Sequence, residues 1–368
     1  MNLYVHFPFC RRKCTYCALY SVAGKNEAFR NEYVEKLSNA IIKSSCQFKT
    51  VYFGGGTPAL CDLRPIFNAL QNKLHNDYEW TVELSPLDVT YARMKEFYTA
   101  GVNRISMGVQ SLDDETLKSM KRGHTAEDAL IAFKTIREAG FSNAGIDIIA
   151  GYPSAAQNAW ARTLEKLAEF SPDHCSVYSL IHEEGTLLDR EVKNGILRLP
   201  DDDTALDELI MAREVLGALS LERYEISSYA KKGFECKHNL SVWRGEDYLG
   251  LGAGAHGRIG RYRTLGTFEN LTPLFPLGDE VHISDSVELT EQEDALERVF
   301  FRLRTSEGLN LDMMADEFPV LSCRVEEWKK KLFRLKDEGF IVPLQNGNVF
   351  KLSDRGMEVC DAILSELY

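Results

Sequence analysis

Hydrophobic and polar positions along the first two thirds of the chain alternate between two patterns. Short apolar runs, typical of buried strands, occur at residues 3–7, 50–53, 81–84, 104–109, 145–150 and 176–181. Apolar residues spaced i, i+3 and i+4, typical of amphipathic helices, occur at 27–43, 64–74, 91–98, 114–120, 126–138, 159–170 and 204–219. A last extended stretch is expected at 224–228.

Six strand and helix units in succession predict an α/β fold with parallel strands joined by right-handed helical crossovers. The pattern alone admits an open doubly wound sheet or a full or partial barrel. In either architecture, ligands bind at the loops that follow the carboxyl ends of the strands. We therefore look for chemistry in the loops at 10–17, 54–58, 83–86, 110–111 and 151–153.

The pattern changes near residue 271. Helices are expected at 292–303, 313–317 and 325–338, and a short strand pair at 341–342 and 349–352 with a turn at 345–348. This order predicts an α+β module similar to a winged helix, and hence a division into residues 1–270 and 271–368. The segment from 288 onward holds more acids than bases, which favours packing or partner binding over DNA binding.

Composition and charge narrow the class of protein. The chain carries 43 Lys and Arg against 55 Asp and Glu, a net charge of −12, which disfavours nucleic acid as a partner. No apolar run approaches the roughly 18 residues needed to span a bilayer, and the first residues lack the apolar region of a signal peptide. Nine cysteines, an odd number, fit reduced thiols. We therefore expect a cytoplasmic protein.

Three of the nine cysteines are crowded together. Cys10, Cys14 and Cys17 have the spacing C-x3-C-x2-C in the loop after the first predicted strand, whereas the other six are scattered singly. A structural zinc site would need a further Cys or His pair shortly afterwards, and none follows at the right distance. Three thiolates on a cubane iron–sulfur cluster leave one iron without a protein ligand. The spacing therefore favours a [4Fe–4S] cluster with an open iron.

The cysteine spacing, Tyr16 before the third cysteine and the Gly-Gly-Gly-Thr-Pro segment at 54–58 resemble the radical S-adenosylmethionine (SAM) enzymes. The resemblance implies a partial (β/α)6 barrel, with SAM chelated by the open iron through its amino and carboxylate groups. Electron transfer into the sulfonium would then release a 5′-deoxyadenosyl radical. The residues that the resemblance assigns to SAM are Tyr4, Tyr16, Gly55, Gly56, Thr57, Glu83, Gln110, Arg122 and Asp147.

Longer segments narrow the resemblance further. Residues 4–10, 103–111, 147–153 and 224–230 are similar to the oxygen-independent coproporphyrinogen III oxidase family and its heme-chaperone relatives. The oxidase branch has an extension before the cluster strand and a further cysteine two positions after the third. Here nine residues precede Cys10, and position 19 is leucine. Both features point away from the oxidase branch.

The chaperone branch carries an H-N-x-x-Y-W segment implicated in heme binding, and this chain reads His238-Asn239-Leu240-Ser241-Val242-Trp243. The imidazole of His238 could ligate heme iron and the indole of Trp243 could stack on the porphyrin, while Val242 replaces the tyrosine. A heme chaperone is therefore expected. The alternatives are a coproporphyrinogen III oxidase and another porphyrin-modifying radical SAM enzyme.

The resemblance also implies a set of partners. They are heme or a porphyrin, heme-acceptor proteins, an electron donor such as a flavodoxin or ferredoxin, and peripheral contact with membranes that hold acceptors.

Overall fold

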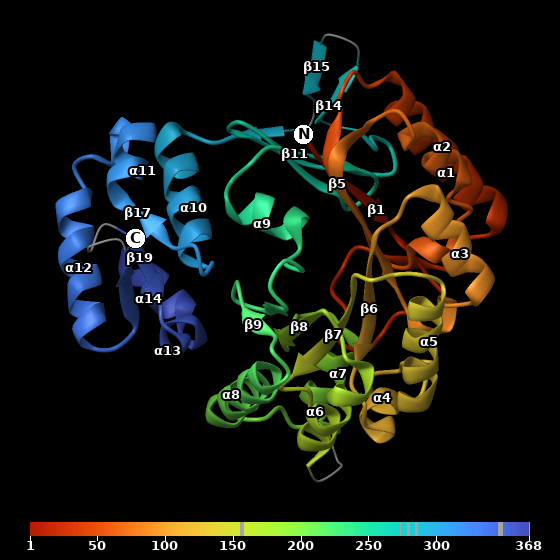
Figure 1. Cartoon of the computed structure of the whole chain (residues 1–368), viewed down its shortest axis with the longest axis horizontal. Helices are drawn as coiled ribbons and strands as arrows, with labels where there is room; N and C mark the ends of the chain where they lie inside the picture. Colours follow the sequence, from red (N-terminus) through yellow and green to blue (C-terminus); the bar gives the residue numbers. More distant parts are fainter. Residues whose placement is uncertain (155–157, 273, 278–279, 284–285, 345–348, 368) are drawn as a thin grey trace.

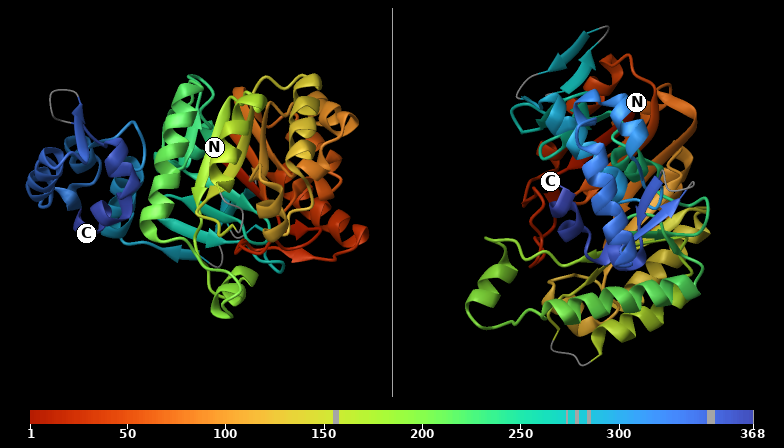
Figure 2. Two further views of the ribbon diagram at one scale, coloured as in Figure 1. Left: turned by 90° about the horizontal axis from the view of Figure 1, so that it is seen from below. Right: turned by 90° about the vertical axis from the view of Figure 1, so that its left-hand side faces the viewer.

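The computed structural model describes residues 1–154, 158–272, 274–277, 280–283, 286–344 and 349–367. It has two lobes, a large one containing the N-terminus and a smaller one containing the C-terminus (Figure 1). The two lobes lie side by side (Figure 2), and the strand at 286–288 and the helix at 291–303 connect them.

The large lobe is built on parallel strands whose order in the sheet follows the sequence. They are β1 (Asn2–Phe7), β4 (Phe48–Gly55), β5 (Leu74–Leu84), β6 (Arg104–Gln110), β7 (Ala144–Ala150) and β8 (His174–Ser179). The helices between and after them are α1 (Glu27–Lys43), α2 (Arg64–Leu70), α3 (Tyr91–Ala100), α4 (Asp114–Ser119), α5 (Ala126–Glu138), α6 (Ala159–Phe170), α7 (Leu187–Lys193) and α8 (Asp202–Ala218). The predicted strand and helix units are confirmed.

The parallel strands carry nearly continuous runs of apolar residues, because both faces of the sheet are covered. Phe7, Phe53 and Trp80 are fully buried on neighbouring strands and belong to one hydrophobic core with the inner faces of the helices. The Phe53 and Trp80 rings meet edge to face with centroids 5.5 Å apart. This core holds the strands in register and leaves their carboxyl ends free for a site.

Several details of the large lobe differ from the predictions. The second predicted helix ends at Leu70, because Leu74 already begins the long strand β5. Helix α7 was not predicted. The stretch expected to be extended at 224–228 contains a turn between β9 (Glu222–Arg223) and β10 (Ser228–Ala230). The apolar residues of this stretch pack against other parts of the fold: Tyr224 is buried beside His174, and Ile226 packs on the C-terminal core.

Short strands extend both edges of the parallel sheet. In the described part of the chain the full order is β16-β13-β12-β11-β1-β4-β5-β6-β7-β8-β10-β9. The added strands on the β1 side are β11 (Tyr248–Leu251), β12 (His256–Ile259), β13 (Tyr262–Leu265) and β16 (Ser286–Glu288). Helix α9 (Lys237–Trp243) lies between this extension and the C-terminal lobe (Figure 1). Outside the sheet, β2 (Phe9–Cys10) pairs with β3 (Val22–Ala23), and β14 (Leu274–Leu277) pairs with β15 (Glu280–Ile283).

The C-terminal lobe confirms the winged-helix-like module. Its elements are α10 (Glu291–Leu303), β17 (Leu309–Asn310), α11 (Leu311–Glu317), α12 (Val325–Asp337), β18 (Ile341–Leu344), β19 (Val349–Leu352), α13 (Asp354–Glu358) and α14 (Cys360–Leu367). The last two helices were not predicted. The turn expected at 345–348 lies outside the described residues. Trp328 is buried at the centre of a separate hydrophobic core.

The division expected after residue 270 stays a prediction. Strand β16 still belongs to the large sheet, where it pairs with β13, while the separate C-terminal core begins at Ala295. These two observations favour a boundary between β16 and α10, which starts at Glu291.

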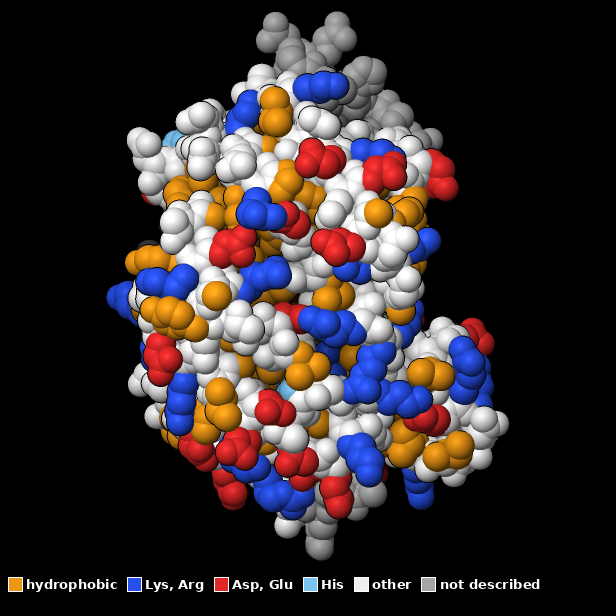
Figure 3. Space-filling view, turned by 90° about the vertical axis from the view of Figure 1, so that its right-hand side faces the viewer, with side chains coloured by type: hydrophobic (Ala, Val, Ile, Leu, Met, Phe, Trp, Pro, Cys, Tyr) orange, Lys and Arg blue, Asp and Glu red, His pale blue; other side chains and the backbone are white. Residues whose placement is uncertain are grey.

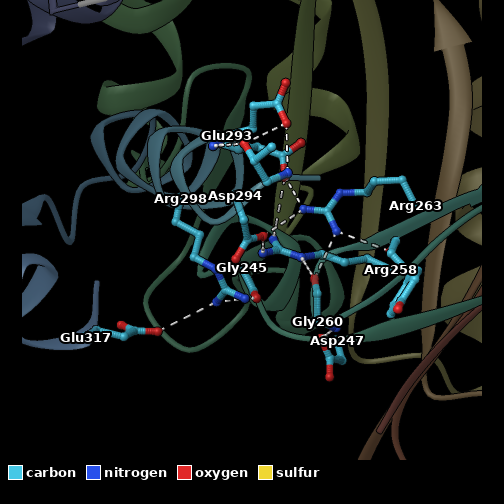
Figure 4. A network of polar contacts seen from close by, with 12 residues as sticks. Gly245, Asp247, Arg258, Gly260, Arg263, Glu293, Asp294, Arg298 and Glu317 are labelled. Atoms are coloured by element: carbon cyan, nitrogen blue, oxygen red, sulfur yellow. Dashed lines mark hydrogen bonds and ion pairs between the residues drawn. The ribbon is translucent and has the colours of Figure 1, made fainter. Parts of the chain in front are cut away.

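The two lobes are joined by a buried network of charges (Figure 4). Asp294 on α10 accepts hydrogen bonds from Arg258 of β12 at 2.7 Å, from Arg263 of β13 at 3.1 Å and from Arg298 at 3.1 Å. Arg298 also donates to the carbonyl of Gly245, just after α9, at 3.0 Å. One carboxylate therefore ties the sheet extension, the C-terminal lobe and the end of α9 together.

The outer face over the helices of the large lobe carries acidic and basic side chains interspersed with apolar ones (Figure 3). Of the helices that the structure describes, none is both long enough and apolar enough to cross a membrane.

Candidate functional site

The carboxyl ends of the parallel strands surround a cavity of about 920 Å³. Most of the residues assigned to the cluster and SAM line it: Cys10, Cys14, Tyr16, Cys17, Gly55, Gly56, Thr57, Glu83, Gln110, Arg122 and Asp147. They come from several strands and loops that are distant in sequence. The topology therefore brings the predicted set together, apart from Tyr4.

The three cysteine side chains lie close enough for the charge of one to shift the pKa of another. Cys10 ends β2, and the backbone N–H of Cys17 donates to the carbonyl of Cys14 at 3.4 Å. Burial raises the pKa of Cys10 and of Cys17, and a neighbouring thiol raises each further: Cys17 acts on Cys10, and Cys14 acts on Cys17. Thiols of this kind bind metal as thiolates, and their protons are released to solvent as the metal binds.

The described residues contain no three His, Cys, Asp or Glu side chains close enough to share a single metal ion. A single ion requires thiolate sulfurs at about 2.3 Å from one centre. A four-iron cluster has a different requirement, because each thiolate binds a separate iron and the sulfurs stand farther apart. The crowded cysteines facing one cavity fit a cluster.

Arg122 lines the cavity and contacts the cysteine loop. Its Nη1 donates to the Sγ of Cys14 at 3.4 Å, and its Nη2 donates to the carbonyl of Gly108 at 2.6 Å. Arg122 follows Lys121, whose φ of 57° lies in the left-handed region. The turn thus directs a positive charge at the sulfur, where a thiolate would be stabilised.

The glycine-rich loop packs directly on the cysteine strand. The N–H groups of Gly56 and Thr57 donate to the carbonyls of Phe7 and Phe9, both at 2.8 Å. A Cβ on Gly56 would lie 2.6 Å from the Phe9 carbonyl oxygen and 2.9 Å from the Sγ of Cys10. Only glycine allows this approach, so the loop and the cysteine strand form one surface.

Two carboxylates, Glu83 and Asp147, line the same cavity and lie close enough to interact electrostatically. Glu83 accepts hydrogen bonds from the Tyr52 hydroxyl at 2.8 Å and the Gly55 N–H at 3.2 Å. Asp147 accepts from the Ser106 hydroxyl at 3.1 Å. Burial, with the charge of Asp147 adding to it, raises the pKa of Glu83 to about 7. Burial also raises the pKa of Asp147. The cavity is therefore suited to a ligand that offers hydroxyl donors or positive charge.

Gln110 lies at an irregularity of the sheet. Its φ of 72° is in the left-handed region, and the register between β6 and β7 shifts between Gly108 and Gln110. A non-glycine residue in this region stores strain, a feature that clusters at ligand sites. The irregularity ends β6 at the cavity wall, where Gln110 lines it.

A second cavity of about 740 Å³ adjoins the first. The predicted heme residues His238 and Trp243 line it, and so do Val242 and Tyr4. The structure thus places Tyr4, which was predicted to border SAM, in the second cavity. Its hydroxyl contacts Nδ1 of His6 at 3.0 Å, so the side chain points away from the first cavity.

The tautomer of His238 follows from its hydrogen bonds. The amide nitrogen of Asn2 donates to the carbonyl of Asp247 at 3.2 Å, which leaves its oxygen to accept from the Thr50 hydroxyl at 2.9 Å. The Thr50 oxygen then accepts from Nδ1 of His238 at 2.8 Å. Burial lowers the pKa of His238 to about 3. The imidazole is therefore neutral with its lone pair on Nε2, the form that ligates iron.

Helix α9 is held by residues from distant parts of the chain. Glu79 of β5 accepts from the backbone N–H groups of Lys237 and His238, both at 3.0 Å, at the first turn of the helix. At the other end, the Trp243 ring meets Phe301 of α10 edge to face, with centroids 5.7 Å apart. Val242, four residues after His238, shares its helix face. The helix therefore presents His238 and Val242 to the cavity from a supported position.

Several residues of the site were missed by sequence reasoning. Ala18, Leu19 and Tyr178 line both cavities, as does the predicted Glu83, and Tyr52 and Glu225 line the second. Glu225 is buried and hydrogen-bonds with Trp243. A signal was present for Tyr178, because it lies in a predicted strand, and ligands are expected near the carboxyl ends of these strands. Tyr52 reads as an ordinary core residue inside an apolar run.

Comparisons with known proteins place the chain in a family. Residues 4–167 match the model of the radical SAM superfamily. The heme chaperone HemW of Bacillus subtilis is 32% identical over 334 residues, covering 86% of each chain. HemW of Escherichia coli is 35% identical over 269 residues, covering 70% of each chain.

A solved structure gives the fold. Coproporphyrinogen III oxidase (HemN) from Escherichia coli, a radical SAM enzyme, superposes with a TM-score of 0.80 at 20% identity. The match covers 100% of this chain and 89% of the other. It confirms the partial barrel with its C-terminal module. On its fold, and on the identity and coverage of its relatives, this chain belongs to the HemW family of heme chaperones within the radical SAM superfamily.

Proposed function

We propose that this protein binds heme in the second cavity and passes it to acceptor proteins. The observation that carries the proposal is the neutral His238, whose Nδ1 is occupied by Thr50 and whose Nε2 keeps its lone pair. Trp243 and Val242 provide apolar surface for a porphyrin in the same cavity. The relatives that carry the name heme chaperone support the transfer role.

The first cavity would hold the [4Fe–4S] cluster and SAM. Cys10, Cys14 and Cys17 supply the three thiolates, and the Gly55–Thr57 loop approaches them without side chains in the way. Glu83 is placed to accept from ribose hydroxyls, with Tyr16, Gln110, Arg122 and Asp147 completing the polar wall. When bound, the cluster supplies an open iron and electrons for SAM.

One observation favours an enzyme as the second candidate. The two cavities share Leu19 and Glu83, so a porphyrin in the second would lie beside SAM in the first. Radical decarboxylation of a porphyrinogen propionate, or another porphyrin modification, is therefore the alternative. The chaperone is preferred because position 19 is leucine and because His238 is prepared as an iron ligand.

The surface near the proposed cluster supports an electron donor as a further partner. Arg11, Arg12, Lys13 and Lys121 line the first cavity, and all four are exposed. Exposed basic side chains beside a cluster suit an acidic electron donor such as a flavodoxin or ferredoxin. We place the protein in the cytoplasm, with peripheral membrane contact where acceptors are membrane-bound.

The test is anaerobic reconstitution with iron and sulfide, followed by incubation with reductant, SAM and either heme or coproporphyrinogen III. Stoichiometric heme retention without turnover supports the chaperone. Measured conversion of coproporphyrinogen III to protoporphyrinogen IX, or SAM-dependent consumption of heme, would contradict it.

Two variants assign the sites within the same experiment. Replacing Cys10, Cys14 and Cys17 together with alanine should abolish the cluster absorption. His238→Ala should reduce heme retention and alter the Soret band while leaving the cluster absorption intact. His75→Ala is the matched control, because that histidine is exposed and contacts Asp77 away from both cavities.

A further inference from the structure

One face of strand β4 runs from the second cavity to the first. Thr50, Tyr52 and Gly54 lie on this face because alternate residues of a strand point to the same side. Thr50 accepts from Nδ1 of His238, and Gly54 lies so close to Glu83 that a Cβ there would approach its Oε2 to 3.0 Å. Tyr52, between them, contacts both ends.

The two contacts of Tyr52 are of different kinds. Its ring packs on the imidazole of His238 with centroids 5.1 Å apart and an interplanar angle of 32°. Its hydroxyl donates to Oε1 of Glu83 at 2.8 Å. The Tyr52 side chain is buried, so both contacts have little exposure to bulk water. A hydrogen bond to a carboxylate is among the stronger ones in a protein, and burial keeps its geometry defined.

We propose that Tyr52 couples the two cavities, so that SAM held at Glu83 and heme held at His238 bind cooperatively. The inference rests on the proposed function, which places those ligands there. SAM fixes the Glu83 carboxylate, and the Tyr52 hydroxyl that donates to it is fixed as well. The ring then holds the His238 imidazole in place, so the imidazole loses less conformational entropy when heme binds to it. By linkage, heme must favour SAM by the same factor.

Thr50 and Glu79 contact only the His238 side of this arrangement. Thr50 sets the tautomer of His238, and Glu79 holds the first turn of α9. Neither touches Glu83 in the described structure, so neither can report the state of the SAM cavity. Tyr52 is thus a positioning residue: its hydroxyl contacts Glu83 on the SAM side, and its ring positions the His238 imidazole on the heme side.

The test measures heme affinity by Soret titration of the reconstituted full-length protein, with and without SAM. The cluster is kept oxidised so that SAM is not cleaved. In the parent protein we expect SAM to tighten heme binding about fivefold to tenfold, the lower range of known coupling between sites. In Tyr52→Phe, which keeps the ring and removes the hydroxyl, we expect the effect of SAM to fall below about twofold.

Tyr78→Phe is the matched control. Tyr78 donates to the carbonyl of Gly101 at 2.8 Å and lines neither cavity, so the same chemical change should leave the coupling at its parent value. The reciprocal titration, SAM affinity with and without heme, must give the same factor in each variant.

The outcomes separate the inference from the function on which it rests. If the parent protein binds heme alone and SAM alone, but SAM leaves the heme dissociation constant unchanged or weakens it, the coupling is wrong and the proposed function stands. If coupling persists in Tyr52→Phe, the two ligands act on each other without this hydroxyl, and the role of Tyr52 is wrong. If either ligand fails to bind on its own, the proposed function itself is wrong, and the coupling proposed from it is wrong as well.

Discussion

The guanidinium of Arg122 donates to the Sγ of Cys14 across 3.4 Å, and the same group donates to the carbonyl of Gly108. A positive charge is thereby fixed next to a sulfur that the cluster would use. Burial leaves the charge poorly screened by water, so its influence on the sulfur is strong.

Arg122→Met should make the reduction potential of the cluster more negative. Hydrogen bonds to cluster sulfurs and nearby charge set the potential, and a cation stabilises the more negative reduced state. We expect a decrease of about 60 mV, a tenfold change for one electron. A potentiometric titration followed by electron paramagnetic resonance measures it. Arg93→Met is the control, because Arg93 donates to the Ala59 carbonyl outside both cavities. An unchanged potential in Arg122→Met would place the cluster away from this guanidinium.

Binding of the ribose part of SAM should depend on the ionisation of Glu83. The ionised carboxylate accepts hydrogen bonds from ribose hydroxyls, and burial raises its pKa to about 7. Affinity should therefore fall as the pH drops through 7, by about tenfold from pH 8 to pH 6 if only the ionised form binds.

Methylthioadenosine is the probe for this pH dependence, since it carries the ribose without the titrating amino group of SAM. Isothermal titration calorimetry gives the dissociation constants. Glu83→Gln should bind weakly and with a flat pH profile, and a slope equal to that of the parent protein would assign the titration to another group.

Val242→Tyr should strengthen heme binding. Val242 lies one helical turn from His238 and lines the second cavity, which has room for a larger side chain. An aromatic contact contributes roughly 0.5–1.5 kcal/mol, which corresponds to a dissociation constant lower by roughly twofold to tenfold. Soret titration measures the change. Val287→Tyr, at an exposed position of β16, should leave heme affinity unaltered. Weaker binding in Val242→Tyr would mean that the porphyrin occupies the space of the valine.

Asp294→Asn should destabilise the junction of the two lobes. Arg258 and Asp294 have side chains 2% and 4% exposed, and the carboxylate is shared with Arg263 and Arg298. Removing one partner of a buried ion pair costs about 3–5 kcal/mol of unfolding free energy, and partial exposure of the other arginines favours the lower end. Urea unfolding measures the loss.

The control for that variant is Asp361→Asn. Asp361 is 85% exposed and pairs with Arg304 on the surface, so its loss should cost less than about 1 kcal/mol. Equal effects of the two substitutions would show that the buried network contributes no more than a surface pair.

The local elements and the cluster motif could be predicted from the sequence by itself. Helices α1, α5 and α6 begin and end where the apolar spacing predicts, because each has one apolar face that packs on the sheet. The cysteine triple and the glycine-rich segment are contiguous in the chain, so their spacing alone indicates the chemistry. The parallel direction of the strands also followed from the pattern, whereas the partial barrel was implied only by the resemblance to radical SAM enzymes.

The tertiary structure alone decided how the two cavities relate. Helix α9 is only seven residues long, too short to be stable or recognisable alone, and it exists where Glu79 from β5 holds its first turn. Thr50 and His238 are 188 residues apart, yet their hydrogen bond sets the tautomer of the imidazole. Tyr52 has the pattern of a core residue, and only the fold places its hydroxyl on Glu83 and its ring on His238. Local patterns record the burial of a side chain, whereas its partners depend on which strands the topology sets side by side.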